Sequence, residues 1–142
     1  MVSGYRISEQ LSEMDLNAIH GFIGSSYWAA GIPLATFKRA LENSLCFGVL
    51  TNEGQQVGFA RMITDQATFA YLADVFIDEA HRGKGLSKWL MQSVHQHPQL
   101  QGLRRMMLAT RDAHGLYQQV GYTALNVPEI FMEKWDPQVY AR

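Results

Sequence analysis

Three features follow one another directly between residues 75 and 90: a run of strand-forming residues, a basic glycine-rich turn and an apolar-periodic segment. This order predicts a β-strand, a tight loop and the first turns of a helix. The first amides of a helix have no intrahelical partner, and the helix dipole favours negative charge beside them. Gly83 and Gly85 let the backbone approach a ligand, and Arg82 and Lys84 add positive charge. The segment therefore predicts a phosphate or pyrophosphate site, the alternative being an ordinary tight connection.

Two other phosphate-binding loops are excluded by their spacing. A Walker loop needs four residues between its first glycine and a Gly-Lys-Ser/Thr sequence, whereas here Lys84 precedes Gly85 and Leu86 follows it. The dinucleotide-binding fingerprint needs a third glycine or alanine further along, and a strand near the start of a domain. Neither pattern fits this chain.

Two segments carry a family resemblance. Residues 82–87 are Arg-Gly-Lys-Gly-Leu-Ser, and residues 113–122 are Ala-His-Gly-Leu-Tyr-Gln-Gln-Val-Gly-Tyr. The first resembles the acetyl-CoA pyrophosphate loop of the GNAT family of N-acetyltransferases, Arg/Gln-x-x-Gly-x-Gly/Ala, with Ser87 at the last position. The second is similar to that family's Ala-x-x-Leu-Tyr-x-x-x-Gly-Phe segment, with Tyr122 in place of phenylalanine. Both occur in the family's order and at its usual separation, so the resemblance covers nearly the whole chain and implies one N-acetyltransferase domain over residues 1–142.

Hydrophobic periodicity and turn residues predict the element order β-α-α-β-β-β-α-β-α-β-β. An antiparallel meander followed by a right-handed strand-helix-strand crossover gives a mixed, mostly antiparallel central sheet flanked by helices, which is the α+β class. The expected helices cover residues 14–23, with Ser12 as the cap, and residues 34–43, 85–95 and 112–120. The expected strands cover residues 5–7, 45–51, 56–64, 68–77, 106–110, 122–126 and 129–134.

This element order is that of the acyl-CoA N-acyltransferase fold of the same family. The resemblance implies that the fourth and fifth strands separate and that the pantetheine arm of acetyl-CoA lies between them, beside Val75 and Ile77. It also implies that a backbone N–H near Phe76 or Ile77 polarises the thioester carbonyl, which can be worth about 10²–10³ in rate. The residues expected to hold the pyrophosphate are Arg82, Gly83, Lys84, Gly85, Leu86 and Ser87.

Two residues are candidates for proton transfer. Tyr117 matches the tyrosine that points its hydroxyl at the cofactor sulfur in many family members, so the resemblance implies a general acid. The alternative is a core aromatic residue on a short amphipathic helix. Asp74 interrupts the apolar run of residues 71–77, which makes it a candidate general base on a central strand. Its alternatives are a structural hydrogen-bond anchor or a charge that recognises a cationic amine, and ordered water can replace a single base.

The candidate acceptor site follows the first expected helix, in residues 26–33. Tyr27 and Trp28 lie in a loop and not on a helical stripe, so they can stack on an apolar or aromatic amine. The alternative is that they close the edge of the core. Arg61 and Arg111 are candidates for binding a substrate carboxylate, with surface ion pairs as the alternative.

Composition excludes several other classes of protein. A net charge of −1 over 142 residues gives no reason to expect nucleic acid or an anionic membrane as a partner. The only cysteine, Cys46, lies in an apolar run and is expected to be a buried small hydrophobe. No carboxylate cluster supports a metal site at His95 and His97. The sequence shows no signal peptide and no apolar run long enough to span a bilayer, which predicts a cytoplasmic protein.

Together these features predict an N-acetyltransferase that uses acetyl-CoA, needs no metal and acetylates a small-molecule amine by direct transfer in a ternary complex. One alternative is a protein acetyltransferase that acts on lysine or an N-terminus, but no acidic run suited to lysine-rich targets is present. Another is a non-catalytic CoA-binding sensor, which the presence of Tyr117 disfavours. The exposed edge strands of such a sheet also allow a homodimer.

Overall fold

The computed structural model describes residues 1–141 of the chain. Its centre is a five-stranded sheet in which the strands lie side by side in the order in which they occur along the chain. Neighbouring strands are antiparallel from β1 to β4, and β5 runs parallel to β4. The strands are β1 (Tyr5–Ser8), β2 (Leu45–Thr51), β3 (Gln56–Thr64), β4 (Phe69–Ile77) and β5 (Arg105–Met107).

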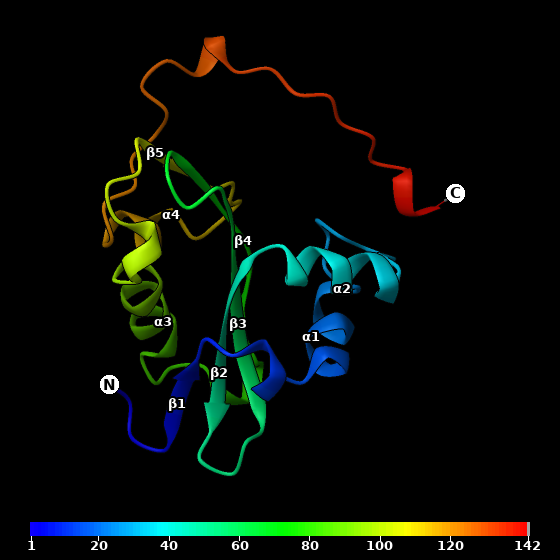
Figure 1. The fold of residues 1–142 in the computed structure, drawn as a ribbon, viewed down its shortest axis with the longest axis vertical. Helices are drawn as coiled ribbons and strands as arrows, with labels where there is room; N and C mark the ends of the chain where they lie inside the picture. Colours follow the sequence, from blue (N-terminus) through cyan, green and yellow to red (C-terminus); the bar gives the residue numbers. More distant parts are fainter. Residues whose placement is uncertain (142) are drawn as a thin grey trace.

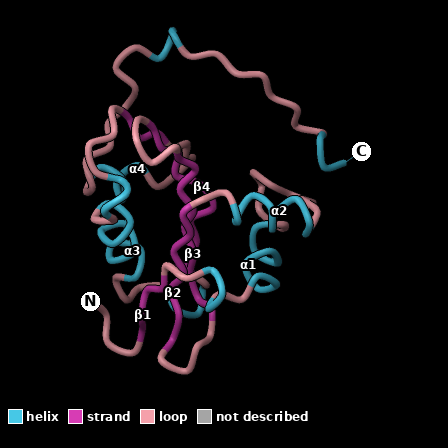
Figure 2. Tube along the Cα trace, viewed as in Figure 1, coloured by secondary structure: helices cyan, strands magenta, loops and turns pink. Residues whose placement is uncertain are grey.

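Helices cover both faces of this sheet (Figure 1). The helices α1 and α2 pack on one face, and α3 and α4 pack on the other, so that strands form the middle layer (Figure 2). This arrangement confirms the predicted α+β class. The bounds of the helices are α1 (Leu16–Ile23), α2 (Leu34–Glu42), α3 (Leu86–His95) and α4 (His114–Gln118).

The start of α1 differs from the prediction. The Asp15 carboxylate accepts a hydrogen bond from the Ala18 N–H at 3.0 Å and caps the helix, whereas Ser12 lies in the preceding 3₁₀ turn, Leu11–Glu13. A capping side chain must stand immediately before the first helical residue to reach the free amides. Asp15 occupies that place, so the prediction of Ser12 as the cap was wrong.

β4 carries a bulge at Asp74 and Val75, which together lie opposite the single residue Ala60 of β3. Asp74 adopts a left-handed backbone with φ of 58°. One extra residue exchanges the two faces of a strand. Leu72, before the bulge, belongs to the hydrophobic cluster on the α3 side, whereas Phe76, after it, belongs to the cluster on the α1 side.

β4 and β5 separate just before this bulge. Their paired register runs from Phe69 with Arg105 to Tyr71 with Met107 and ends there, whereas β4 continues to Ile77. The strand predicted over residues 106–110 is therefore shorter, because a bulge bends its strand and increases the local twist. The fourth and fifth strands therefore separate, as the family resemblance implied.

The last two predicted strands, residues 122–126 and 129–134, do not form. Within residues 122–141 the backbone is irregular apart from 3₁₀ turns at Pro128–Ile130 and Val139–Ala141. A strand needs a neighbouring strand to satisfy its backbone N–H and C=O groups. This segment instead leaves the sheet near β5 and arches toward α2 (Figure 1), so within the described residues it has no neighbouring strand with which to pair.

The tightest backbone packing in the sheet gives a prediction. A Cβ atom at Gly58 would lie 2.7 Å from Cδ1 of Ile77 and 3.1 Å from both the Phe76 carbonyl oxygen and Cβ of Val49. Gly58→Ala should lower the free energy of unfolding by about 1–3 kcal/mol through overpacking, as measured by urea denaturation. Gly21→Ala is the matched control, because it lies inside α1 with open space around it. The control should raise stability by about 0.5–1 kcal/mol, and equal effects would contradict the prediction.

Candidate active site

A cavity of about 670 Å³ opens where β4 and β5 separate. It is lined by separate parts of the chain: α1 and the loop after it, β4, the loop before α3, residues 108–113 and α4. Of the residues predicted for the site, the cavity brings together Tyr27, Trp28, Asp74, Val75, Phe76, Ile77, Arg82, Ser87 and Tyr117. Arg111 also lines the cavity, whereas the other predicted residues, Arg61, Gly83, Lys84, Gly85 and Leu86, do not.

The glycine loop, residues 82–87, presents an open backbone before α3. Gly83 and Gly85 have φ values of 80° and 82°, a left-handed conformation that glycine adopts without strain. A Cβ atom on either would meet no atom of the described chain within 4 Å. Gly85 is the N-cap of α3, and no side chain of residues 1–141 caps the first amides. These amides are therefore available to an anion such as a pyrophosphate.

The remaining residues of the glycine loop fix its position. Nε of Arg82 donates a hydrogen bond to the Ile77 carbonyl oxygen at 2.9 Å, which ties the loop to the end of β4. Nζ of Lys84 lies 5.7 Å from the centre of the Tyr5 ring. Leu86 is buried in the α3-side cluster and holds the helix against the sheet.

Asp74 accepts two hydrogen bonds from residues on different elements. Its Oδ1 accepts from Nε1 of Trp28 at 2.8 Å, and its Oδ2 accepts from Nε of Arg61 at 2.8 Å. The Arg61–Asp74 ion pair is largely buried, with side-chain exposures of 14% and 5%. Asp74 lines the cavity, as the catalytic prediction requires, but both of its oxygens are engaged by the protein. Of its predicted roles, this geometry favours the structural anchor.

Arg61 does not project into the cavity to bind a substrate carboxylate. Besides its ion pair with Asp74, its Nη1 donates to Oγ of Ser44 at 3.2 Å. Arg61 does not line the cavity, so of its two predicted roles the structure supports the ion pair and not the binding of a substrate carboxylate.

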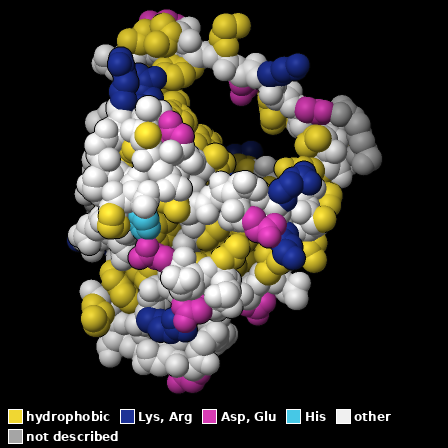
Figure 3. Space-filling view, viewed as in Figure 1, with side chains coloured by type: hydrophobic (Ala, Val, Ile, Leu, Met, Phe, Trp, Pro, Cys, Tyr) yellow, Lys and Arg dark blue, Asp and Glu magenta, His cyan; other side chains and the backbone are white. Residues whose placement is uncertain are grey.

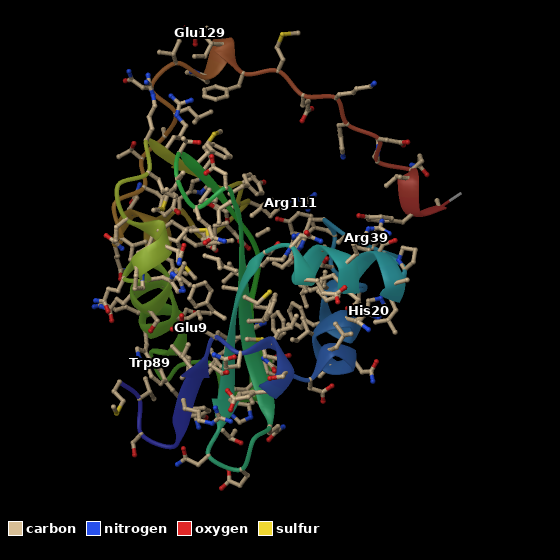
Figure 4. All side chains as sticks on the ribbon, in the orientation of Figure 1. Glu9, His20, Arg39, Trp89, Arg111 and Glu129 are labelled. Atoms are coloured by element: carbon tan, nitrogen blue, oxygen red, sulfur yellow. The ribbon has the colours of Figure 1, made fainter. Side chains whose placement is uncertain are left out.

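The predicted acceptor residues form an aromatic mouth. Tyr27 and Trp28 are 57% and 44% exposed, and their rings meet edge-to-face with centroids 5.0 Å apart. The Arg111 guanidinium, from the loop after β5, lies 3.7 Å from the centre of the Tyr27 ring. Figure 4 shows Arg111 between the sheet and the side of the molecule that α2 covers. Because Asp74 binds the indole of Trp28, this mouth is held in place against β4.

Phe22 is a cavity residue that the sequence reasoning missed. Its ring stacks on that of Phe76 with centroids 4.0 Å apart, so α1 supplies one apolar wall. In the sequence Phe22 is one of the apolar residues at helical spacing that predict an amphipathic helix over residues 14–23. The helical pattern alone does not distinguish an apolar residue that packs in the core from one that lines a cavity, so the sequence carries no signal for the role of Phe22.

Tyr117 is buried in α4 with its hydroxyl free. Burial raises the pKa of Tyr117, and the nearby Asp112 carboxylate and Tyr27 raise it further. The side chain is therefore a protonated donor at neutral pH. Within the described residues the Tyr117 hydroxyl donates to no protein acceptor. The hydroxyl oxygen is not fully buried, so the missing hydrogen bond leaves no unsatisfied polar atom in the core. Since Tyr117 lines the cavity, its proton is available there.

The neighbouring Tyr122 has a different environment. Burial lowers the pKa of His95, so the ring is neutral, and its Nδ1–H donates to the Met91 carbonyl oxygen at 2.6 Å. Nε2 of His95 is then the acceptor for the Tyr122 hydroxyl at 2.9 Å. Burial also raises the pKa of Tyr122 to about 12. Of the two tyrosines in the family motif, only Tyr117 has its proton free for a ligand in the described chain.

Other chemistry is limited by the same geometry. Cys46 is buried as predicted, its thiol donates to the Leu41 carbonyl oxygen, and burial raises its pKa to about 12. Within residues 1–141, no group of three histidine, cysteine, aspartate or glutamate side chains is placed to hold a metal ion. In the same residues, no helix has the length and apolar character needed to cross a membrane.

Residues 42–124 match the family model of the acetyltransferase (GNAT) domain. The chain belongs to the GNAT family of acetyltransferases. This match confirms the resemblance seen in residues 82–87 and 113–122 and the enzyme class that it implied, an N-acetyltransferase.

Known relatives agree with this assignment. A protein from Gibberella zeae named as an acetyltransferase is 34% identical over 135 residues, which cover 80% of this chain and 75% of that protein. A crystal structure from Xanthomonas campestris pv. campestris, described as an acetyltransferase of the GNAT family, is 48% identical with a TM-score of 0.95 and covers 100% of both chains. A Deinococcus radiodurans acetyltransferase structure is 20% identical, covers 99% of this GNAT chain and 94% of its own, and has a TM-score of 0.76, which shows a shared fold alone.

The anchoring of Asp74 gives a second prediction. Asp74→Asn should lower the free energy of unfolding by about 3 kcal/mol, because it leaves the largely buried Arg61 without its counter-charge. Urea denaturation measures the loss. The double variant Asp74→Asn/Arg61→Gln should recover part of this stability, since no unpaired charge remains. If the double variant loses as much free energy of unfolding as the two single variants together, the result would contradict an energetic coupling between Arg61 and Asp74.

Proposed function

We propose that this chain is an acetyl-CoA-dependent N-acetyltransferase that acetylates a small-molecule amine by direct transfer in a ternary complex. The observation that carries the proposal is a single cavity lined by Arg82 and Ser87 of the glycine loop, by Tyr117, and by the aromatic mouth of Tyr27 and Trp28. Groups suited to hold a donor and groups suited to hold an acceptor therefore share one space. The proposal takes residues 1–142 as one N-acetyltransferase domain, and the predicted cytoplasmic location stays a prediction.

The residues present fit acetyl-CoA, which supplies an acetyl group activated as a thioester when bound. The uncapped amides of the glycine loop and the space beside Gly83 and Gly85 suit a pyrophosphate. β4 from Val75 to Ile77 lies beyond its pairing with β5, so its backbone on that side is available to a pantetheine chain. We propose that a backbone N–H near Phe76 or Ile77 donates to the thioester carbonyl oxygen.

Direct transfer is supported by the state of the one cysteine. Cys46 is buried, its thiol has a pKa of about 12, and it does not line the cavity. A thiol in that state is a poor nucleophile, so an acetyl-cysteine intermediate is disfavoured. Attack by the amine on the bound donor needs no such intermediate.

The size of the cavity supports a small acceptor. Its volume of about 670 Å³ falls within the usual range for small-molecule sites, about 300–1,000 Å³. A protein acetyltransferase would need an open groove for its target. Tyr27 and Trp28 offer rings on which an apolar or aromatic amine can stack, and Arg111 above Tyr27 offers a positive charge for a carboxylate at the same mouth.

The transfer needs a general acid for the departing thiolate and a general base for the amine. We assign the general acid to Tyr117, because its free, protonated hydroxyl can donate to the departing thiolate. Asp74 stays the candidate base on the cavity wall, but its bonds to Arg61 and Trp28 support a positioning role more strongly. In that role it fixes the aromatic mouth, and the amine loses its proton to ordered water.

The function is tested by following thiol release from acetyl-CoA against a panel of small amines and lysine peptides, together with thermal unfolding in acetyl-CoA alone. We expect a raised unfolding temperature and turnover with a small amine. Turnover with peptides alone would favour a protein acetyltransferase. Thermal stabilisation without turnover on any acceptor would favour the CoA-binding sensor.

The same assay tests the glycine loop. Gly85→Val should abolish the thermal shift with acetyl-CoA, because a branched side chain cannot adopt φ of 82° without strain and would fill the space beside the amides. Gly102→Val is the matched control, since Gly102 also has a left-handed φ, of 74°, and open space around it but lies outside the glycine loop. Unchanged acetyl-CoA binding in Gly85→Val would remove the pyrophosphate assignment.

A further prediction concerns the general acid. Tyr117→Phe should lower kcat by about 10²-fold or more with little change in KM for acetyl-CoA, since proton donation acts in the transition state. Because burial raises the pKa of Tyr117 above the ordinary value of a tyrosine, the native enzyme should keep this donor protonated through neutral and mildly alkaline pH. A loss of kcat between pH 8 and 9 that Tyr117→Phe abolishes would contradict the assignment.

The matched control is Tyr122→Phe, which removes a hydroxyl bonded to His95. It should cost about 1 kcal/mol of stability and leave kcat nearly unchanged. Equal loss of kcat in the two variants would point to packing of α4 and not to proton donation.

A further inference from the structure

Four charged side chains line the catalytic cavity, and the structure accounts for two of them. Asp74 is paired with Arg61, and Arg82 is bonded to the end of β4 beside the glycine loop. The other two, Arg111 and Asp112, are neighbours in the chain and carry opposite charges. They lie on the loop between β5 and α4, and the contacts described so far give Asp112 no role in the site.

The protein neutralises neither member of this pair. Both side chains are exposed to solvent while they line the cavity. Within residues 1–141, neither Arg111 nor Asp112 forms an ion pair or a side-chain hydrogen bond. A few polar groups that converge on a cavity orient the molecule bound there and make it specific. One positive and one negative group are therefore available to a ligand in the same cavity.

Arg111 is held in a position from which it can bind a carboxylate. Its guanidinium lies 3.7 Å from the centre of the Tyr27 ring, and Tyr27 meets the Trp28 ring that Asp74 anchors. A guanidinium on the face of a ring keeps the N–H groups along its edge, and these fit both oxygens of a carboxylate. The positive charge thus has a fixed place at the aromatic mouth.

Asp112 lies on the side of the cavity where transfer takes place in the proposed function. Burial is the largest cause of the raised pKa of Tyr117, and the Asp112 carboxylate is the next. The carboxylate is therefore close to the hydroxyl that is assigned to protonate the departing thiolate. The nitrogen of the acceptor has to approach the same place, because the reacting atoms must meet within about 3–3.5 Å.

We infer that the acceptor end of the cavity binds a free amino acid with an apolar or aromatic side chain, its ammonium group at Asp112 and its carboxylate at Arg111. In naming this amino acid as the acceptor, the inference rests on the proposed function. The two binding residues are consecutive, and the ammonium and carboxylate of an amino acid are attached to one carbon atom, so opposite charges are close together in both partners. The stacked rings of Phe22 and Phe76 offer an apolar wall to the side chain.

The same pair of charges disfavours other classes of acceptor. A simple amine leaves Arg111 without a counter-charge, and a polyamine places a second positive charge beside it. A phosphorylated amine brings its negative charge close to Asp112, and like charges in contact are unfavourable. Acidic and basic side chains of the described residues are interspersed over the face of the molecule in Figure 3, whereas a charged peptide is best bound by a surface of one sign.

Isothermal titration calorimetry of the full chain in the presence of CoA tests the inference. The ligands are L-phenylalanine and L-leucine, the amines that lack their carboxylate (phenethylamine and isoamylamine) and the acids that lack their ammonium group (hydrocinnamate and isocaproate). At least one amino acid should bind about tenfold more tightly than both of its analogues, because each analogue loses a charge-assisted hydrogen-bonding group.

Three variants assign each charge to its partner. Arg111→Gln should raise the Kd of the amino acid about tenfold and change that of the amine less than about twofold. Asp112→Asn should weaken binding of the amino acid and the amine but not of the acid. Arg39→Gln is the matched control, because Arg39 is an exposed arginine of α2 that does not line the cavity (Figure 4). A variant that merely unfolds loses all three ligands, so it cannot produce this crossed pattern.

Equal affinity for the amino acids and their amines would overturn the inference, as would an equal loss of both ligands in Arg111→Gln. Thiol release from acetyl-CoA with the same ligands separates this result from the proposed function. Turnover of the amines with no preference for the amino acids would overturn the inference alone. Preferred binding of an amino acid without turnover of any acceptor would overturn the proposed function and leave the amino-acid site standing.

Discussion

The extra residue of β4 at Asp74 is the constraint on which the rest of this structure depends. Two residues of β4 lie opposite Ala60, so the second half of the strand exchanges faces and separates from β5. A carboxylate in this place needs partners, because an unpaired buried charge costs several kcal/mol. Arg61 and Trp28 supply them through charge-assisted hydrogen bonds. The cavity is therefore held open by a buried charge that is fully paired.

The same strand connects the two ends of the candidate site. Beyond the bulge, the Ile77 carbonyl oxygen accepts the hydrogen bond from Arg82 that fixes the glycine loop, and within the bulge Asp74 fixes Trp28 in the aromatic mouth. One rigid element thus positions the groups suited to the donor and those suited to the acceptor. Tyr117 completes the cavity from α4, on the other side of the gap.

Most of the fold could be predicted because each of its elements carries a local signal. β2, β3 and α3 follow the predicted ranges closely, since apolar periodicity, turn residues and glycines act over a few neighbouring residues. The failures arise where the partner is distant. Residues 122–126 and 129–134 have the composition of strands, but no strand in the described part of the chain pairs with them. The bulge at Asp74 was equally hidden, because a bulge is defined by the register against β3 and not by the sequence of β4 alone.

By itself the sequence determined the glycine loop, the tyrosine motif and the residues of the aromatic mouth, because left-handed glycines, helix starts and loop aromatics are local properties. Only the tertiary structure decided how these residues are used. Trp28 and Asp74 are 46 positions apart in the chain, and their hydrogen bond turns a candidate base toward a structural role. The bond between His95 and Tyr122 occupies one motif tyrosine and leaves the hydroxyl of Tyr117 free. The protonation and availability of a side chain depend on partners that folding brings together, and the spacing of a motif does not record them.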